Sequence, residues 1–91
     1  MRRLKLPGEI DLANCDAVLA DFLAEVNSDG VASTIEIDCC DLEFIDSSGL
    51  KMLVQLADQT GKRIVLIAMS ENCRRVFEIT DLDHVFELRD R

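Results

Sequence analysis

The segment Phe44-Ile45-Asp46-Ser47-Ser48-Gly49-Leu50 joins two parts of the chain that have different hydrophobic patterns. Before it, residues 34–39 alternate apolar and polar side chains, which predicts a strand. After it, apolar residues recur at helical spacing, which predicts an amphipathic helix over residues 47–60. The stripe of that helix is Leu50, Leu53, Val54 and Ala57. The acid, the two hydroxyls and the glycine therefore fall on a helix N-terminus, where unpaired backbone N–H groups favour a negative group.

The rest of the chain alternates between strand and helix patterns. Pro7-Gly8 ends the first strand, Asn14 is the predicted N-cap of the first helix, Gly61 ends the second helix and Ser70 caps the third. The predicted helices carry apolar stripes over residues 15–26, 47–60 and 73–80. The predicted strands cover residues 3–6, 34–39, 64–69 and 85–88. This order predicts an α/β fold with a mostly parallel four-stranded sheet, mixed if an extra edge strand forms, and helices packed against it.

Composition and charge restrict the function. We expect the 91 residues to form a single domain over residues 1–91. The formal net charge of −8 argues against binding of nucleic acid or an anionic membrane surface. The longest apolar run, Ile64 to Met69, is too short to span a bilayer, so no membrane insertion is expected. No basic segment is followed by a signal-like apolar run, so we expect a cytoplasmic protein.

Neither the cysteines nor the single histidine forms a metal-binding pattern. No two of the four cysteines have the C-x-x-C spacing, and His84 has no ligand-like neighbour in the sequence. We therefore expect no metal and no cofactor, and cysteines that act as small hydrophobic residues in a reducing compartment. Cys39 and Cys40 are adjacent on a strand and should point to opposite faces.

Three segments resemble a known family. Leu6–Asp11 resembles the G-E-[IL]-D entry into the first helix of STAS domains. Asp41–Leu50 resembles the D-L-x-x-[IM]-D-S-[ST]-G-L segment of bacterial anti-sigma factor antagonists. Phe77–Leu82 resembles the F-x-[IL]-[ST]-x-L phrase in the last part of these domains. With the elements between them in the expected order, the resemblance covers Leu4–Leu88.

The resemblance implies a non-enzymatic regulatory switch that controls transcription. In this family, the antagonist binds an anti-sigma factor, often a serine kinase, and so frees the sigma factor. The kinase phosphorylates the serine that follows the motif's aspartate, and a PP2C-type phosphatase removes the phosphate. Carried over to this chain, the phospho-acceptor is Ser47.

The resemblance also implies a recognition surface around Ser47. Asp46 flanks the phosphorylation site, Ser48 is the neighbouring hydroxyl, and Gly49 would let a partner's backbone approach closely. Lys51 and Met52 lie on the helix side expected to face the partner, and Met52 and Leu56 fall off the apolar stripe. Asp11 either ends a loop or lies on the partner surface. The acidic residues Asp38, Asp41, Glu43 and Asp46 are expected to form a solvated rim.

The chain departs from the family pattern at three places. Lys51 stands where many members have a small residue. The first family strand is missing or reduced to residues 1–3, and the chain stops at Arg91, where many members continue into a further helix. A sheet without its edge strand exposes backbone groups that can pair with another chain, so a homodimer is one expected arrangement.

Two other functional classes compete with the switch. One is a STAS scaffold that is not phosphorylated, for example a subunit of a lipid-transport ABC complex; the intact D-S-S-G-L motif argues against it. The other is an enzyme that uses Asp46 and Ser47, but a nucleophilic serine needs a base, and His84 has no orienting partner in the sequence. Nucleotide binding is not expected, because the sequence contains no Gly-rich phosphate loop.

Overall fold

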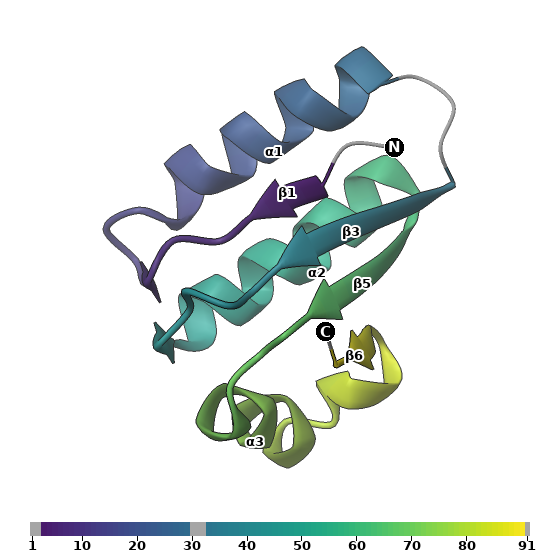
Figure 1. Cartoon of the computed structure of the whole chain (residues 1–91). Helices are drawn as coiled ribbons and strands as arrows, with labels where there is room; N and C mark the ends of the chain where they lie inside the picture. Colours follow the sequence, from purple (N-terminus) through teal and green to yellow (C-terminus); the bar gives the residue numbers. More distant parts are fainter. Residues whose placement is uncertain (1–2, 30–32, 91) are drawn as a thin grey trace.

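The computed structural model describes residues 3–29 and 33–90. Its helices are α1 (Cys15–Asp29), α2 (Ser47–Thr60) and α3 (Glu71–Ile79), and a short 3-10 helix, η1 (Leu82–His84), follows α3. One sheet contains the strands β1 (Arg3–Lys5), β3 (Thr34–Asp38), β5 (Arg63–Ile67) and β6 (Glu87–Arg89). A small second sheet pairs β2 (Glu9–Ile10) with β4 (Phe44–Ile45). Figure 1 shows these elements.

The four-stranded sheet confirms the predicted α/β fold. Its strand order is β1-β3-β5-β6, and each neighbouring pair is parallel. The register places Leu4 beside Ile37, and Ile37 beside Leu66. Because cross-strand neighbours share a face of the sheet, these side chains form an apolar row on one side. Since the strands are parallel, their carboxyl ends meet at one edge, where the chain turns into β2 and β4 (Figure 1).

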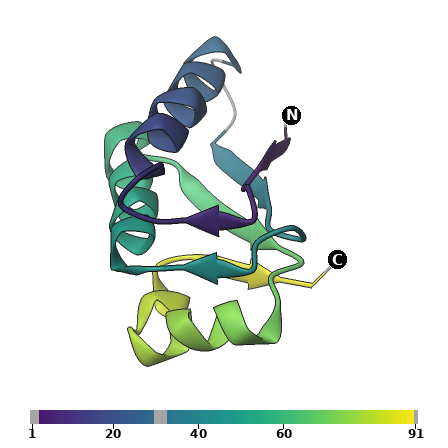
Figure 2. The same ribbon diagram turned by 90° about the vertical axis from the view of Figure 1, so that its left-hand side faces the viewer.

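The apolar face of the sheet packs against the helices. α1 and α2 lie together on one side of the sheet (Figure 2). Phe77 from α3 packs edge-to-face on Phe86, with ring centroids 5.9 Å apart. The most deeply buried side chains of this core include Leu6, Ile10, Ile37, Leu42, Met52, Leu53, Leu56, Ile64, Leu66 and Phe77.

Charged side chains cover the other face of the sheet. Val65 and Ile67 are 1% and 4% exposed but lie outside the main core. On this face Val65 lies between Glu36 and Glu87, and Ile67 lies beside Arg89. Arg89 pairs with Glu36 at 3.6 Å, and the aliphatic stems of such long side chains can shield apolar groups. The β5 strand is thus covered on both faces, by helices on the first and by ion-paired side chains on the second.

Helix ends follow the predicted local signals at α2 and α3. Gly61 has φ 65° and its N–H bonds to the carbonyl of Ala57, which ends α2. Ser70 precedes α3, and its Oγ accepts a hydrogen bond from the Cys73 N–H at 3.3 Å. Among the helices of the described residues, none has the length and apolar content that a membrane crossing requires.

Several details of the predicted secondary structure differ from the structure. β2 and β4 were not predicted, because a two-residue strand has no periodicity to detect. The last strand begins at Glu87 rather than Val85, because Val85 and Phe86 donate their N–H groups to the Leu82 carbonyl in the turn around η1. Asn14 stands at the N-cap position of α1, but its side chain accepts from the Asp11 N–H and donates to the Glu9 carbonyl, so it holds the preceding turn.

Candidate functional site

Asp46 fixes the start of α2. Its backbone is extended, with φ −103° and ψ −174°, and its Oδ1 accepts a hydrogen bond from the Gly49 N–H at 3.0 Å. Its carbonyl accepts the Leu50 N–H at 3.1 Å, which is the first hydrogen bond of the helix. The Asp46 N–H in turn donates to the Ile10 carbonyl of β2. The motif's aspartate is therefore an N-cap, and it ties the start of α2 to the small sheet.

Ser47 is exposed at the first position of α2, and Ser48 behind it is half-buried. In the described part of the chain, neither hydroxyl has a hydrogen-bond partner, and the N–H groups of both residues lack an acceptor. The site therefore presents a free hydroxyl beside two free backbone donors. A phosphate on Ser47 would find hydrogen-bond donors without any rearrangement of the helix.

Gly49 is required by packing within the chain. It is buried, and a Cβ at this position would lie 2.6 Å from Cγ2 of Ile10 and 2.7 Å from Cγ1 of Ile45. The space beside its Cα is thus filled by residues of β2 and β4. The expectation that this glycine leaves room for a partner's backbone is corrected, because the chain's own isoleucines occupy that room.

Asp11 shapes the turn that leads into α1. Its Oδ1 accepts the Ala13 N–H at 2.9 Å, and its carbonyl accepts the N–H groups of Asn14 and Cys15. The structure therefore gives Asp11 the loop-ending role that the sequence left open. Its side chain remains half-buried, and its place on a partner surface stays a prediction.

A groove of about 200 Å³ lies beside Ser48. Its lining comes from the start of α1 and the first two turns of α2: Leu12, Cys15, Asp16, Ser48, Lys51, Met52 and Gln55. Lys51 is exposed, as predicted for a surface residue. The expectation that Met52 and Leu56 face outward is wrong, because they are 2% and 0% exposed. The core stripe of α2 is rotated relative to the predicted one, and Val54 and Ala57 are only half-buried.

Two exposed apolar side chains near the site were missed from the sequence. Leu12 is 77% exposed and lines the groove, and Phe44 is 51% exposed two residues before Asp46. Phe44 belongs to β4, whose other residue, Ile45, points into the core. The alternation of Phe44 and Ile45 was the signal available in the sequence, but it needed the β2–β4 pairing to be interpreted.

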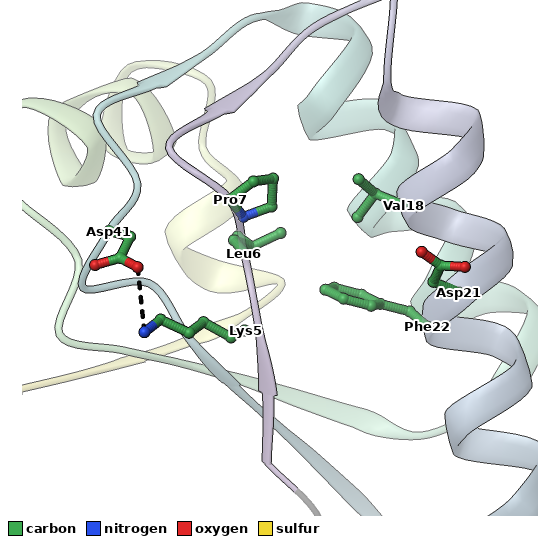
Figure 3. Close-up of a pocket in the computed structure, with 7 residues that line it drawn as sticks. All are labelled: Lys5, Leu6, Pro7, Val18, Asp21, Phe22 and Asp41. Atoms are coloured by element: carbon green, nitrogen blue, oxygen red, sulfur yellow. Dashed lines mark ion pairs between the residues drawn. The ribbon is translucent and has the colours of Figure 1, made fainter.

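A larger hollow of about 450 Å³ lies between the end of β1 and α1. Figure 3 shows Lys5 and Asp41 on one side of it and Val18, Asp21 and Phe22 on α1 on the other. Lys5 Nζ lies 3.1 Å from an oxygen of Asp41, and this hydrogen-bonded carboxylate raises the pKa of Lys5. The lining of this hollow shares no residue with the groove beside Ser48, so the hollow and the groove are separate features.

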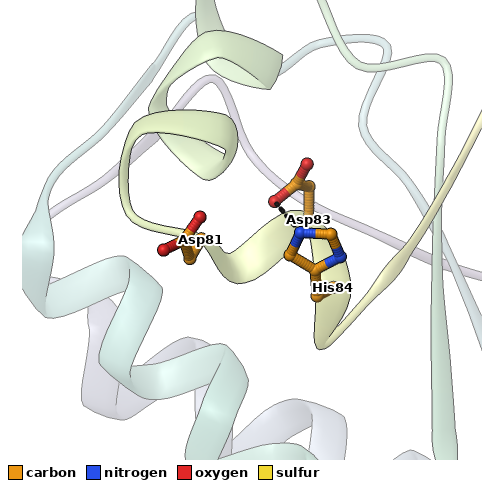
Figure 4. A group of neighbouring side chains, drawn as sticks. All are labelled: Asp81, Asp83 and His84. Carbon is orange, nitrogen blue, oxygen red and sulfur yellow. Dashed lines mark ion pairs between the residues drawn. The ribbon is translucent and has the colours of Figure 1, made fainter.

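The expectation that His84 has no ligand-like neighbour is wrong, because Asp81 and Asp83 precede it closely in the sequence and lie near it in the structure. Asp81, Asp83 and His84 each offer a potential ligand atom, and these atoms lie within 4.8 Å of one another (Figure 4). They gather because Asp81 adopts the left-handed conformation, with φ 62°, and turns the chain. Asp83 is 32% and His84 81% exposed. Such exposed groups often gather without an ion, and we assign no metal to this cluster.

The cysteines have the environments expected of small hydrophobic residues, with one exception. Cys15, Cys39 and Cys73 are buried, and Cys40 is exposed. Cys39 and Cys40 therefore differ in burial, but the prediction that both lie on a strand is wrong, because β3 ends at Asp38 and Cys40 lies in a turn. Burial raises the pKa of the Cys39 thiol to about 12.

The fold and the D-S-S-G-L helix start define a STAS-type domain, and comparisons with known proteins agree. The model of the family described as "Mlab, STAS domain" matches residues 2–90. The chain therefore belongs to the STAS domain family. The anti-sigma-F factor antagonist RsfB of Mycobacterium tuberculosis is 32% identical over 87 residues, which are 93% of this chain and 70% of that protein.

Solved structures show the same fold. The crystal structure of an anti-sigma factor antagonist from Mycobacterium paratuberculosis superposes with a TM-score of 0.81 at 29% identity, covering 96% of this chain and 74% of that one. A putative anti-sigma factor antagonist from Thermotoga maritima gives a TM-score of 0.79 at 23% identity, over 94% of this chain and 76% of that one. At that identity, the second likeness concerns the fold alone.

Proposed function

We propose that this chain is a cytoplasmic anti-sigma factor antagonist and that phosphorylation of Ser47 controls its binding to an anti-sigma factor with serine kinase activity. A PP2C-type phosphatase restores the binding form. The observation that carries this proposal is the free Ser47 hydroxyl on the first turn of α2, directly after the Asp46 cap. The 32% identity to an anti-sigma-F factor antagonist supports it.

The position of Ser47 allows a phosphate to change binding without changing the fold. A phosphate adds about −1.5 to −2 charges. The free N–H groups of Ser47 and Ser48 stabilise it within the antagonist. A partner that packs on the same spot must instead bury this charge beside the Asp46 carboxylate. A buried charge without a partner costs about 2–4 kcal/mol, which weakens binding roughly 30- to 1,000-fold.

The surface around Ser47 has the composition of a protein-binding site. Leu12 and Phe44 expose apolar area close to the motif in sequence or space. A partner that covers this surface would bury both side chains and gain the free energy of removing their apolar area from water. Lys51 and the rim of the groove supply polar groups around them. We therefore place the anti-sigma factor over the start of α2 and the turn before α1.

The same geometry favours binding over catalysis at Ser47. A serine nucleophile needs a base within hydrogen-bonding reach. Among the described residues, no side chain bonds to the Ser47 hydroxyl. His84 lies in η1, where its acidic neighbours are Asp81 and Asp83. We therefore propose a non-enzymatic role for this chain.

Affinity capture with four baits tests this function. The baits are the wild-type chain, Ser47→Ala, Ser47→Asp and the control Ser33→Asp, which adds the same charge at an exposed serine before β3. We expect an anti-sigma factor, identified by mass spectrometry, on all baits except Ser47→Asp. A partner held equally by all four would refute the phosphorylation switch and would favour a constitutive STAS scaffold.

A further inference from the structure

Lys51 is an exposed cation one helical turn after Ser47. It lines the groove together with Ser48 and Met52. Within residues 3–29 and 33–90, Lys51 forms no ion pair and no side-chain hydrogen bond. Lys5, Arg63, Arg74 and Arg89 each hold a carboxylate, whereas Lys62 and Arg75 resemble Lys51 in having no such partner among the described residues. What distinguishes Lys51 from Lys62 and Arg75 is its position, one helical turn after the proposed phosphorylation site.

The helix places Lys51 within reach of a group on Ser47. The two residues stand at positions i and i+4 of α2. Side chains at this spacing share a helix face, with Cβ atoms about 5–6 Å apart. The lysine stem spans this distance, and an anion at i with a lysine at i+4 is the more favourable order because it agrees with the helix dipole.

The other charges around the groove are negative. Asp16 of α1 lines the same groove as Lys51. Asp46 lies at the N-cap, and its Oδ1 is already bonded to the Gly49 N–H. Both carboxylates repel a phosphate on Ser47. Lys51 is thus the cation of this groove lining that is available to offset them.

We propose that Lys51 is the second charged element of the switch. When Ser47 is unmodified, the ammonium pairs with a carboxylate of the anti-sigma factor. When Ser47 is phosphorylated, the ammonium pairs with the phosphate. Phosphorylation then acts on the partner twice, since it adds an anion beside Asp46 and withdraws a cation that the partner uses. This inference rests on the proposed function of Ser47.

A phosphorus NMR titration tests the phosphate pair directly. Phosphoserine is placed at position 47 during translation, in the wild-type background and with Lys51→Gln, Lys51→Arg or the control Lys62→Gln, which lies beyond the far end of α2. We expect Lys51→Gln to raise the second pKa of the phosphate by about 0.2–0.4. Lys51→Arg and Lys62→Gln should match the wild type. An unchanged phosphate pKa in Lys51→Gln would overturn the inference.

Binding of the unmodified chain to the anti-sigma factor tests the proposed pairing of Lys51 with a carboxylate of that partner. With the anti-sigma factor identified by capture, Lys51→Gln should weaken binding about 2- to 5-fold, and Lys62→Gln should leave it unchanged. Equal affinity of Lys51→Gln and the wild type would refute the proposed contact between Lys51 and the partner. Because phosphoserine is placed by translation, the titration does not depend on any kinase. Absence of phosphorylation in the cell would refute the proposed switch and leave the titration result standing.

Discussion

The substitution Gly49→Ala should destabilise the chain although it improves helix propensity. The added Cβ would lie 2.6 Å from Ile10 and 2.7 Å from Ile45, and both isoleucines are buried. Overpacking a core costs typically 1–3 kcal/mol. Because two β-branched side chains of a paired small sheet must move together, we expect a cost of about 3 kcal/mol. Alanine returns about 1 kcal/mol of helix propensity, which leaves a net loss of about 2 kcal/mol.

Urea unfolding followed by circular dichroism measures this loss as a decrease in the free energy of unfolding. In a thermal melt of a chain of this size, a loss of about 2 kcal/mol corresponds to a melting temperature lower by roughly 8–16 °C. The control is Gly61→Ala, where a Cβ meets nothing within 4 Å and φ is 65°. It should cost about 1 kcal/mol through backbone conformation alone. In an Ile10→Ala/Ile45→Ala background, which removes both clashing γ-carbons, Gly49→Ala should cost much less. A Gly49→Ala chain as stable as the wild type would refute the close packing of α2 on β2.

Three further perturbations follow from the structure. Asp46→Ala should lose about 0.5–2 kcal/mol of stability in urea unfolding because the N-cap is removed, whereas Asp46→Asn should retain most of it; equal losses would argue against capping. In the native chain, the exposed Cys40 should react rapidly with a maleimide. Cys39 is buried and its pKa is raised to about 12, so it should react only when the chain unfolds. Rapid labelling that persists in the Cys40→Ser variant would contradict this expectation. A hydrogen bond from Arg89 lowers the pKa of Glu87, so its stabilising contribution is present above about pH 4.5 and is lost as the pH falls through the lowered value. Glu87→Gln should therefore weaken the acid dependence of the melting temperature, and an unchanged profile would exclude this contribution.

Local signals in the sequence predicted the elements that surround the site. The apolar stripe after the polar run predicted the start of α2, although its cap is Asp46 and the cap considered from the sequence was Ser47. Gly61 and Ser70 predicted the next helix boundaries, because caps and left-handed residues act within a few positions. The apolar run over residues 64–69 predicted the strand β5. Alternation of strands and helices then predicted the parallel sheet.

Contacts between distant segments were not predictable in the same way. The β2–β4 pair joins two residues before α1 to two residues before α2, and neither segment shows a pattern alone. That pairing places Ile10 against Gly49, which explains the glycine by internal packing. The rotation of α2 that buries Met52 depends on how it packs against α1 and the sheet. Lys51 was placed on the surface from its position, but the absence of an ion-pair partner required coordinates.

Calorimetric titration of the identified anti-sigma factor with two forms of this chain measures how a phosphate on Ser47 changes binding. One form is unmodified, and the other carries phosphoserine at position 47, installed during translation. The phosphorylated form should bind at least roughly 30-fold more weakly, because a partner would bury the phosphate beside Asp46. Affinities that agree within measurement error would contradict the assignment of Ser47 as the switch.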